Sequence, residues 1–257
     1  MEIAFNKYQG TGNDFIMIDG RFKTVNISVE QLVKICHRRF GVGADGLIIL
    51  KQHPEVDFEM DYYNADGSKS FCGNGSRCAQ AFAKELGMID DESTFIAIDG
   101  RHEGICSENV FATRMGDVNA IEEIGSDFYL HTGSPHYIRF VDELSSLDVE
   151  KEGRAIRNSA DFREEGVNVN FVSIEGQTLR VRTYERGVEA ETYSCGTGVT
   201  AAAISYLYRQ NSYQNYVELN TLGGRLKVFL DRTEKTEFKS IWLEGPAEKV
   251  YSGSFYL

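Results

Sequence analysis

Two stretches decide the fold of this chain: SFCGNGSRCAQAFAKELG, residues 70–87, and SCGTGVTAAAISYLY, residues 194–208. Each places Cys-Gly-x-Gly directly before an alanine-rich run that is long enough to form a helix. The second run is apolar on every face, which is typical of a helix buried inside a domain. We therefore expect two central helices, each carrying Cys-Gly-x-Gly at its N-terminus.

The two stretches are parts of an internal duplication. Cys72 and Cys195 lie 123 positions apart. Three further pairs of phrases recur in the same order at offsets of 121 to 125, around Thr11 and Thr132, Gly41 and Gly166, and Gly100 and Gly224. The β-branched and aromatic runs between them are typical of strands. The chain is thus predicted as an α+β fold of two pseudosymmetric halves, each a curled mixed or antiparallel sheet wrapped around a central helix.

The boundary between the halves is expected near Met115–Gly116. The N-terminal half would span residues 1–116, joined by the C-terminal tail 250–257, and the C-terminal half would span residues 117–249. No proline- or serine-rich linker separates them, so we expect the halves to pack directly on each other with the active site in the cleft between them. A further amphipathic helix is expected over residues 27–41.

Composition excludes several classes of protein. The 257 residues carry a formal net charge of −12, and no basic cluster is larger than Arg38–Arg39, which argues against binding to nucleic acid. No run approaches the ~20 apolar residues of a membrane span, and the opening residues show no signal-peptide pattern, so we expect a cytoplasmic protein. The five cysteines contain no C-x-x-C, and neither a metal site nor a disulfide framework is expected.

A cysteine at a helix N-terminus has particular chemistry. Unpaired N–H groups and the helix dipole lower a thiol pKa to about 3.5–7.5 in such positions, and the same groups bind carboxylates. If two such N-termini faced each other, one thiolate could remove an α-proton while the opposite thiol delivered one. Cys72 and Cys195 together therefore predict inversion at a carbon. For Cys72 alone, the alternative is a small packed side chain.

The motifs GTGNDF, GVGADG, NADGS, CGNGSRC, NVNF, YERG and CGTG follow one another along essentially the whole chain. This ordered set resembles the diaminopimelate epimerase family. The resemblance implies an isomerase that interconverts LL- and meso-2,6-diaminopimelate for lysine and peptidoglycan precursor biosynthesis, without pyridoxal phosphate or any other cofactor. It also implies a homodimer, since Tyr251 lies where the family places a dimer-contact tyrosine.

The resemblance assigns roles by position. Cys72 and Cys195 correspond to the two catalytic acid–base groups. The backbone cradle for the carboxylate at the reacting carbon corresponds to Gly73, Asn74, Gly196 and Thr197. The substrate's amines and distal carboxylate would be held by Asn13, Asn64, Asn168, Glu185 and Arg186. For the three asparagines, turn formation is the alternative role.

Two positions depart from the family pattern. Ser134 stands where many members have asparagine, and its shorter hydroxyl offers one donor instead of two. Gly46 stands where some members have glutamine. Ser134 and the neighbouring His136 complete the candidate site, whereas Cys36, Cys78 and Cys106 are expected to be packing residues.

Other functions were compatible with parts of this pattern. A proline racemase or hydroxyproline epimerase also uses two cysteines, but Glu185 and Arg186 suit a substrate with a second charged end. A non-catalytic small-amino-acid-binding protein would not need both cysteines. A redox role would join Cys72 to Cys195 in a disulfide, which we expect to inactivate the protein.

Overall fold

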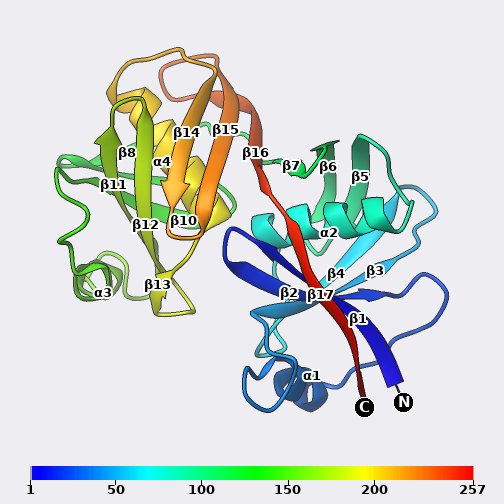
Figure 1. The fold of residues 1–257 in the computed structure, drawn as a ribbon. Coiled ribbons are helices and arrows are strands. Elements are labelled where there is room, and N and C mark those ends of the chain that lie inside the picture. The colour runs from blue at the N-terminus through cyan, green and yellow to red at the C-terminus, as the bar shows by residue number, and fades with distance from the viewer. Residues whose placement is uncertain (1, 257) are drawn as a thin grey trace. The chain divides into compact units, whose positions relative to one another are not determined.

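A computed structural model describes residues 2–256. The chain forms two compact units: the first contains the chain up to Thr113 and the part from Gly245 onward, and the second runs from Arg114 to Glu244. Each unit is a curved sheet with one central helix, α2 in the first and α4 in the second (Figure 1). The predicted α+β class with two duplicated halves is confirmed.

The first unit has the strand order β17-β1-β2-β3-β4-β5-β6-β7. Neighbouring strands are antiparallel except for β2–β3 and β4–β5, which are parallel. Helices α1 (Val29–Cys36) and α2 (Gly73–Glu85) lie in these two parallel crossovers. The strands are β1 (Glu2–Gly10), β2 (Asn13–Asp19), β3 (Gly46–Lys51), β4 (Phe58–Asn64), β5 (Glu92–Ala97), β6 (Gly100–Ser107), β7 (Val110–Arg114) and β17 (Glu248–Tyr256).

The second unit repeats this pattern with the strand order β8-β9-β10-β11-β12-β14-β15-β16. Its parallel pairs are β10–β11 and β12–β14, with α3 (Val149–Arg157) and α4 (Gly196–Arg209) in the crossovers. The strands are β8 (Glu122–Ile124), β9 (Asp127–His131), β10 (Pro135–Phe140), β11 (Asn168–Glu175), β12 (Thr178–Glu185), β13 (Ala190–Thr192), β14 (Tyr216–Thr221), β15 (Gly224–Arg232) and β16 (Phe238–Pro246). The duplication is therefore visible in the order and direction of every principal strand.

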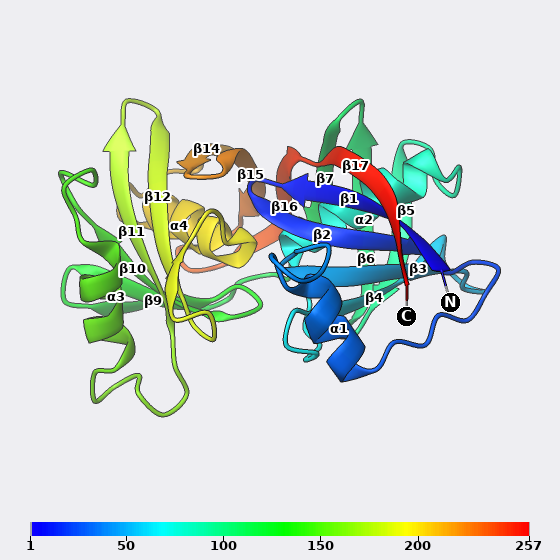
Figure 2. The same cartoon turned by 60° about the horizontal axis from the view of Figure 1, so that its bottom comes forward.

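Alternating side chains give each sheet two buried faces. On β2, Phe15 and Met17 pack in the same core as Phe82 of α2, whereas Ile16 and Ile18 pack on the other face with Leu32 of α1. Figures 1 and 2 show these two helices on opposite sides of the strands. In the second unit, α4 fills the concave face of the sheet and α3 packs on the opposite face. Burial on both faces fixes the strand register, and hence the ends of the strands that carry the candidate site.

The boundaries of the units lie a few residues from those expected. Met115 and Val118 pack in the core of the second unit, so the first unit ends at Thr113. Ala247 packs in the first core, and β17 pairs with β1 from Glu248, so the returning segment begins before residue 250. Within residues 2–256, none of the helices combines the length and the apolar character that a membrane span requires.

Candidate active site

Cys72 is the N-cap of α2, with an extended backbone at φ −136°. Its Sγ lies 3.4 Å from the Gly75 N–H, which belongs to the first turn of the helix. A Cβ at Gly75 would lie 3.2 Å from Ile48 Cδ1 and 3.3 Å from Met60 Cε, so glycine lets the helix start lie close against β3 and β4. The CGNG motif thus places a sulfur at the start of a helix that lies against the sheet.

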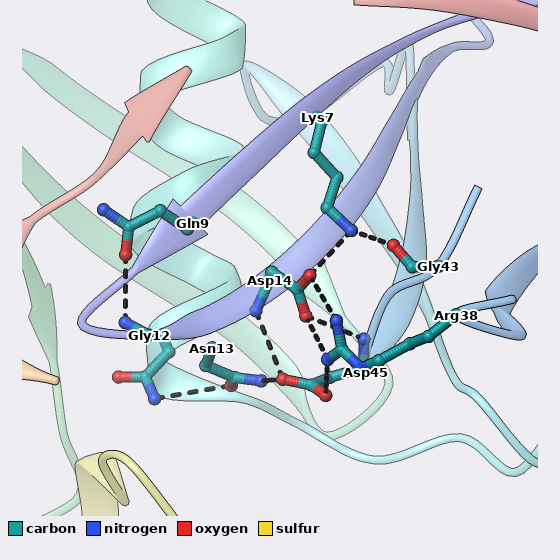
Figure 3. A network of polar contacts seen from close by, with 9 residues as sticks. Lys7, Gln9, Gly12, Asn13, Asp14, Arg38, Gly43 and Asp45 are labelled. Carbon is teal, nitrogen blue, oxygen red and sulfur yellow. Dashed lines mark hydrogen bonds and ion pairs between the residues drawn. The ribbon is translucent and has the colours of Figure 1, made fainter. Parts of the chain in front are cut away.

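The Asn13 side chain lies directly beside this sulfur. Its Oδ1 is 3.5 Å from Cys72 Sγ and accepts a hydrogen bond from Asn74 Nδ2 at 3.4 Å. Its Nδ2 donates to Asp45 Oδ2 at 2.7 Å (Figure 3). Because a carboxylate only accepts, this contact fixes the amide with its carbonyl facing the thiol.

Asp45 belongs to a charged network that ties three segments of the first unit together (Figure 3). Arg38 donates to Asp45 Oδ1 at 2.6 Å and to both oxygens of Asp14, at 2.8 and 3.0 Å. Lys7 lies 2.7 Å from Asp14 and also donates to the Gly43 carbonyl. Burial by itself would raise the pKa of Asp14, but the hydrogen bonds from Arg38 and Lys7 hold it at about 2. These ion pairs support the segment that holds Asn13.

Asn64 ends β4, and its side chain closes the following turn. Its Nδ2 donates to the Ser68 carbonyl and hydroxyl and to Ser70 Oγ, while its Oδ1 accepts from Tyr62. This is the turn role that the sequence left open as an alternative to substrate binding. Opposite Asn64 lies Gly46, where a Cβ would be 2.5 Å from the Tyr62 ring. With Tyr62 and the Tyr63 carbonyl so close, a side chain at position 46 would require its neighbours to shift.

In the second unit, Cys195 is the N-cap of α4 at φ −117° and is 7% exposed. Its Sγ lies 3.5 Å from the hydroxyl of Thr197, which occupies the place that Asn74 has in α2. A Cβ at Gly198 would lie 2.3 Å from Asn170 Oδ1. The second glycine of CGTG is therefore required by the side chain packed beneath it.

His136 connects this helix start to the sheet. Its Nδ1 lies 3.0 Å from Asn170 Nδ2 and its Nε2 lies 2.8 Å from the Thr197 hydroxyl. Because the Asn170 Oδ1 accepts from Thr183, its Nδ2 is the end that donates to His136. His136 therefore carries its proton on Nε2 and donates to Thr197, as assigned from these partners. Burial, with His131 and Arg186 nearby, lowers the pKa of His136 to about 3, so the ring is neutral.

This directed series of hydrogen bonds bears on Cys195. With its oxygen accepting from His136, the Thr197 hydroxyl keeps its own hydrogen available for the sulfur 3.5 Å away. Such a donor stabilises a thiolate. His136 therefore supports the start of α4 in this structure through its contact with Thr197.

Asn168, Ser134 and Arg186 meet at the end of the second sheet. Asn168 Nδ2 donates to Ser134 Oγ at 2.9 Å, and Asn168 Oδ1 accepts from the Arg186 N–H at 2.8 Å. Arg186 Nη2 lies 3.4 Å from Ser134 Oγ, and its Nη1 donates to the Glu165 carbonyl. Ser134 thus accepts from both neighbours and retains one hydroxyl hydrogen to donate. The side chain of Ser134 is short, and Asn168 and Arg186 occupy the space beside its hydroxyl.

The candidate residues occupy equivalent places in the two units. Gly46 pairs with Asn64 across β3–β4, and Asn168 lies opposite Glu185 at the corresponding end of β11–β12. Within each unit, these strand ends carry the residues that the sequence assigned to substrate binding, and the helix N-terminus carries the cysteine. Glu185 Oε2 accepts from Thr192 Oγ1 at 3.0 Å, which holds the carboxylate at the end of β12.

Three residues that support the candidate site were not predicted from the sequence. Asp45, Asn170 and Arg77 all contact candidate residues. All three lie within motifs already recognised, GVGADG, NVNF and CGNGSRC, and each is a polar residue in or beside an apolar strand or helix. That contrast was the available signal.

The other three cysteines, Cys36, Cys78 and Cys106, are buried in the apolar cores, as expected for packing residues. Burial raises the pKa of Cys36 and of Cys106 to about 11. Among the residues that the structure describes, no group of three or more His, Cys, Asp and Glu side chains is arranged to hold a metal ion.

The sequence matches those of known proteins along nearly the whole chain. The family model described as diaminopimelate epimerase matches residues 5–119 and 128–250. The diaminopimelate epimerase of Flavobacterium psychrophilum is 48% identical over 251 residues, which cover 95% of this chain and 97% of that protein. That of Aquifex aeolicus is 38% identical, covering 98% of this chain and 97% of its own.

Solved structures share the fold at much lower identity. A phenazine biosynthesis protein of the PhzF family from Bacillus anthracis aligns with a TM-score of 0.78 at 14% identity, covering 100% of both chains. A probable proline racemase from Agrobacterium radiobacter aligns with a TM-score of 0.69 at 15% identity, covering 99% of this chain and 93% of that one. Identity this low shows similarity of fold alone.

Proposed function

The chain belongs to the diaminopimelate epimerase family, and we propose that Cys72 and Cys195 perform the two proton transfers of this isomerase. The substrate is 2,6-diaminopimelate, interconverted between its LL and meso forms for lysine and peptidoglycan precursor biosynthesis. The observation that carries the assignment of the cysteines is their placement, since each is the N-cap of the central helix of its unit.

The two helix N-termini supply a cradle for the carboxylate at the reacting carbon. Gly73 and Gly196 begin the two helices, and the backbone N–H groups at a helix start can bind an anion. Negative charge grows on this carboxylate as the α-proton leaves, so donors aimed at it stabilise the transition state more than the ground state.

The chemical step needs one base and one acid on opposite faces of the α-carbon. The thiolate of one cysteine takes the α-proton and becomes a thiol, while the electron pair of the C–H bond stays on the carbon and its carboxylate. The thiol of the other cysteine then delivers its proton to the opposite face and becomes a thiolate. We propose that the substrate binds between the two units so that each cysteine addresses one face.

Residues at the sheet ends hold the remainder of the substrate in this proposal. Arg186 offers a planar pair of donors to the distal carboxylate, joined by the free hydrogen of Ser134. Asn13, held with its carbonyl outward from Asp45, accepts from an ammonium. Glu185 is an acceptor for a second ammonium. A substrate with two charged ends fits these groups better than proline does.

We further propose that the protein is a cytoplasmic homodimer. On β17, the side chains of Val250 and Tyr251 are 57% and 45% exposed. Both lie on β17, which pairs with β1 along one edge with a register shift at Val250. Sedimentation equilibrium of the wild type and of Tyr251→Asp tests this assembly, and a monomeric wild type at micromolar concentration would contradict it.

The function is tested by incubating the protein with LL-diaminopimelate or L-proline in D₂O. The expected result is conversion of LL- to meso-diaminopimelate with deuterium at the inverted α-carbon, and no exchange in proline. Cys106→Ala serves as a control for thiol loss, because Cys106 is buried in the first core, where its Sγ contacts Gln80 in the middle of α2. Exchange in proline alone would reject the proposed substrate.

A further inference from the structure

Arg77 is fully buried in the second turn of α2, with 0% of its surface exposed. Its guanidinium donates to Asn74 Oδ1 at 2.8 Å, to Thr11 Oγ1 at 3.3 Å and to the Gly73 carbonyl at 3.4 Å. All three acceptors are neutral, and the buried Nε has no hydrogen-bond partner. A buried cation without an anionic partner is costly, so this charge calls for compensation by a further group.

The ionisable neighbours of Arg77 are two thiols, Cys72 and Cys78. Burial lowers the pKa of Arg77 to about 10, so it remains a cation at neutral pH. Burial raises the pKa of Cys78 far above neutrality, so that thiol stays protonated. The groups left to compensate the charge are Cys72 and an anion bound at the start of α2.

The other charged groups packed around this helix start balance one another. They are Lys7 on β1, Asp14 on β2, and Arg38 and Asp45 in the loop between α1 and β3. Their two positive and two negative charges are paired. Asn13 adds a neutral acceptor at 3.5 Å from the sulfur, which favours the thiol form and opposes the cation. Of the charged side chains named here around the helix start, Arg77 is therefore the one whose charge is not balanced by another.

The duplicated helix has no such cation. Thr200 follows Cys195 by the same five positions as Arg77 follows Cys72, and its hydroxyl donates to the Gly196 carbonyl at 3.0 Å. Because α4 folds with threonine at this place, an arginine is not needed to build the helix start.

Cys195 has a neutral donor instead, the Thr197 hydroxyl 3.5 Å from its Sγ, while the nearby cation Arg186 contacts Asn168 and Ser134 at the sheet end. A neutral hydrogen bond stabilises a thiolate less than a nearby full charge does, so the two sites differ in electrostatics.

We propose that Arg77 is a positioning residue that stabilises Cys72 as the thiolate in the resting protein, while Cys195 rests as the thiol. The guanidinium acts across the first turn of α2, through Asn74 and Gly73, and does not touch the substrate. The catalytic consequence rests on the proposed function: Cys72 is then prepared to accept the α-proton and Cys195 to donate one. The inequality of the two thiols does not depend on which substrate is turned over.

The test is the pH dependence of alkylation by iodoacetamide, followed at each cysteine by peptide mass spectrometry on the full chain. In the wild type, Cys72 is expected to react with a lower midpoint pH than Cys195. In Arg77→Met, the Cys72 midpoint is expected to rise by about one pH unit or more, as loss of a nearby cation does, with Cys195 unchanged. Arg77→Lys keeps the charge, so its Cys72 midpoint is expected to stay close to that of the wild type.

Gln80→Met is the matched control, because Gln80 is equally buried on the same helix but neutral. It should leave the Cys72 midpoint where it is. An unchanged midpoint in Arg77→Met, or an equal rise in Gln80→Met, overturns the proposal. If Arg77→Met does not fold, a wild-type Cys72 midpoint at or above that of Cys195 overturns it. Unequal midpoints in a protein inactive on LL-diaminopimelate would reject the proposed function alone.

Discussion

Asp45 accepts a hydrogen bond from Asn13 Nδ2 at 2.7 Å, and this contact turns the Asn13 carbonyl toward the sulfur of Cys72. The same carboxylate oxygen accepts from the Asp14 N–H, and its other oxygen accepts from Arg38. Both side-chain oxygens of Asp45 therefore face hydrogen-bond donors. A carboxylate can accept from all of them, whereas an amide would direct its NH₂ group at one of them.

Asp45→Asn is expected to lower kcat/KM on diaminopimelate about tenfold to a hundredfold, since one charged hydrogen bond contributes about 1.5–3 kcal/mol. The new NH₂ would face either Arg38 or Asn13, and in the second case the Asn13 amide turns over. Steady-state kinetics measure the effect. Asp57→Asn is the control, because Asp57 also accepts from a backbone N–H and a hydroxyl, both of Thr94. Equal losses in both variants would contradict the positioning role.

Asp14 is expected to stabilise the fold above pH 4. Its folded pKa of about 2 lies below its ordinary value of 3.8, so the stabilisation is present above that value and is lost as pH falls toward 2. At pH 7, the free energy of unfolding of Asp14→Asn should therefore be about 2 kcal/mol lower than that of the wild type. Urea denaturation at several pH values measures this difference, which should shrink below pH 4. A difference that stays constant with pH would contradict the assignment.

His136 should make the free energy of unfolding depend on pH already below pH 6.5, a higher pH than for Asp14. Its folded pKa of about 3 lies below the ordinary 6.5, so between these values the unfolded chain binds one more proton than the folded one. Unfolding free energy should fall as pH drops from 6.5, by about 2 kcal/mol at pH 5. His136→Gln keeps a donor for Thr197 without this titration. If that variant lost as much stability as the wild type between pH 7 and 5, another group would be responsible.

Gly198→Ala is expected to destabilise the second unit by about 1–3 kcal/mol and to reduce turnover. The added Cβ would meet Asn170 Oδ1 at 2.3 Å, and Asn170 fixes the proton on His136. Thermal unfolding and steady-state kinetics measure the two effects. Gly116→Ala is the control, because a Cβ there meets no atom within 4 Å. Wild-type stability and turnover in Gly198→Ala would show that this glycine is not constrained.

Much of the fold was readable because it repeats. The duplicated phrases predicted two halves, and the amphipathic pattern predicted α1, which forms over Val29–Cys36. Helix α3 was not predicted, because its sequence VEKEGRAIR buries only Val149 and Gly153, with Ile156 partly buried against the core. A Cβ at Gly153 would meet the Tyr184 side chain at 2.4 Å, so this helix depends on close packing against β12. Such packing is a tertiary effect that no local pattern reveals.

The residues of the candidate site also fall into two groups, those that a local sequence pattern reveals and those that it does not. Cys72 and Cys195 stand out because each opens a helix in a repeated motif, which is a local signal. The partners that orient the site act over long separations: Asp45 meets Asn13 from 32 positions away, and Asn170 meets His136 from 34. These pairs depend on the parallel register of β2 with β3 and of β10 with β11. Register across a parallel crossover is set by the packed sheet faces rather than by neighbouring residues.

In the proposed mechanism, proton transfer requires both Cys72 and Cys195. The most direct measurement is the conversion of LL- to meso-diaminopimelate in D₂O by the wild type, Cys72→Ala and Cys195→Ala, with deuterium at the α-carbon followed by mass spectrometry. We expect rapid conversion with one deuterium by the wild type and loss of conversion in each single variant. Near-normal conversion by either variant would contradict this mechanism.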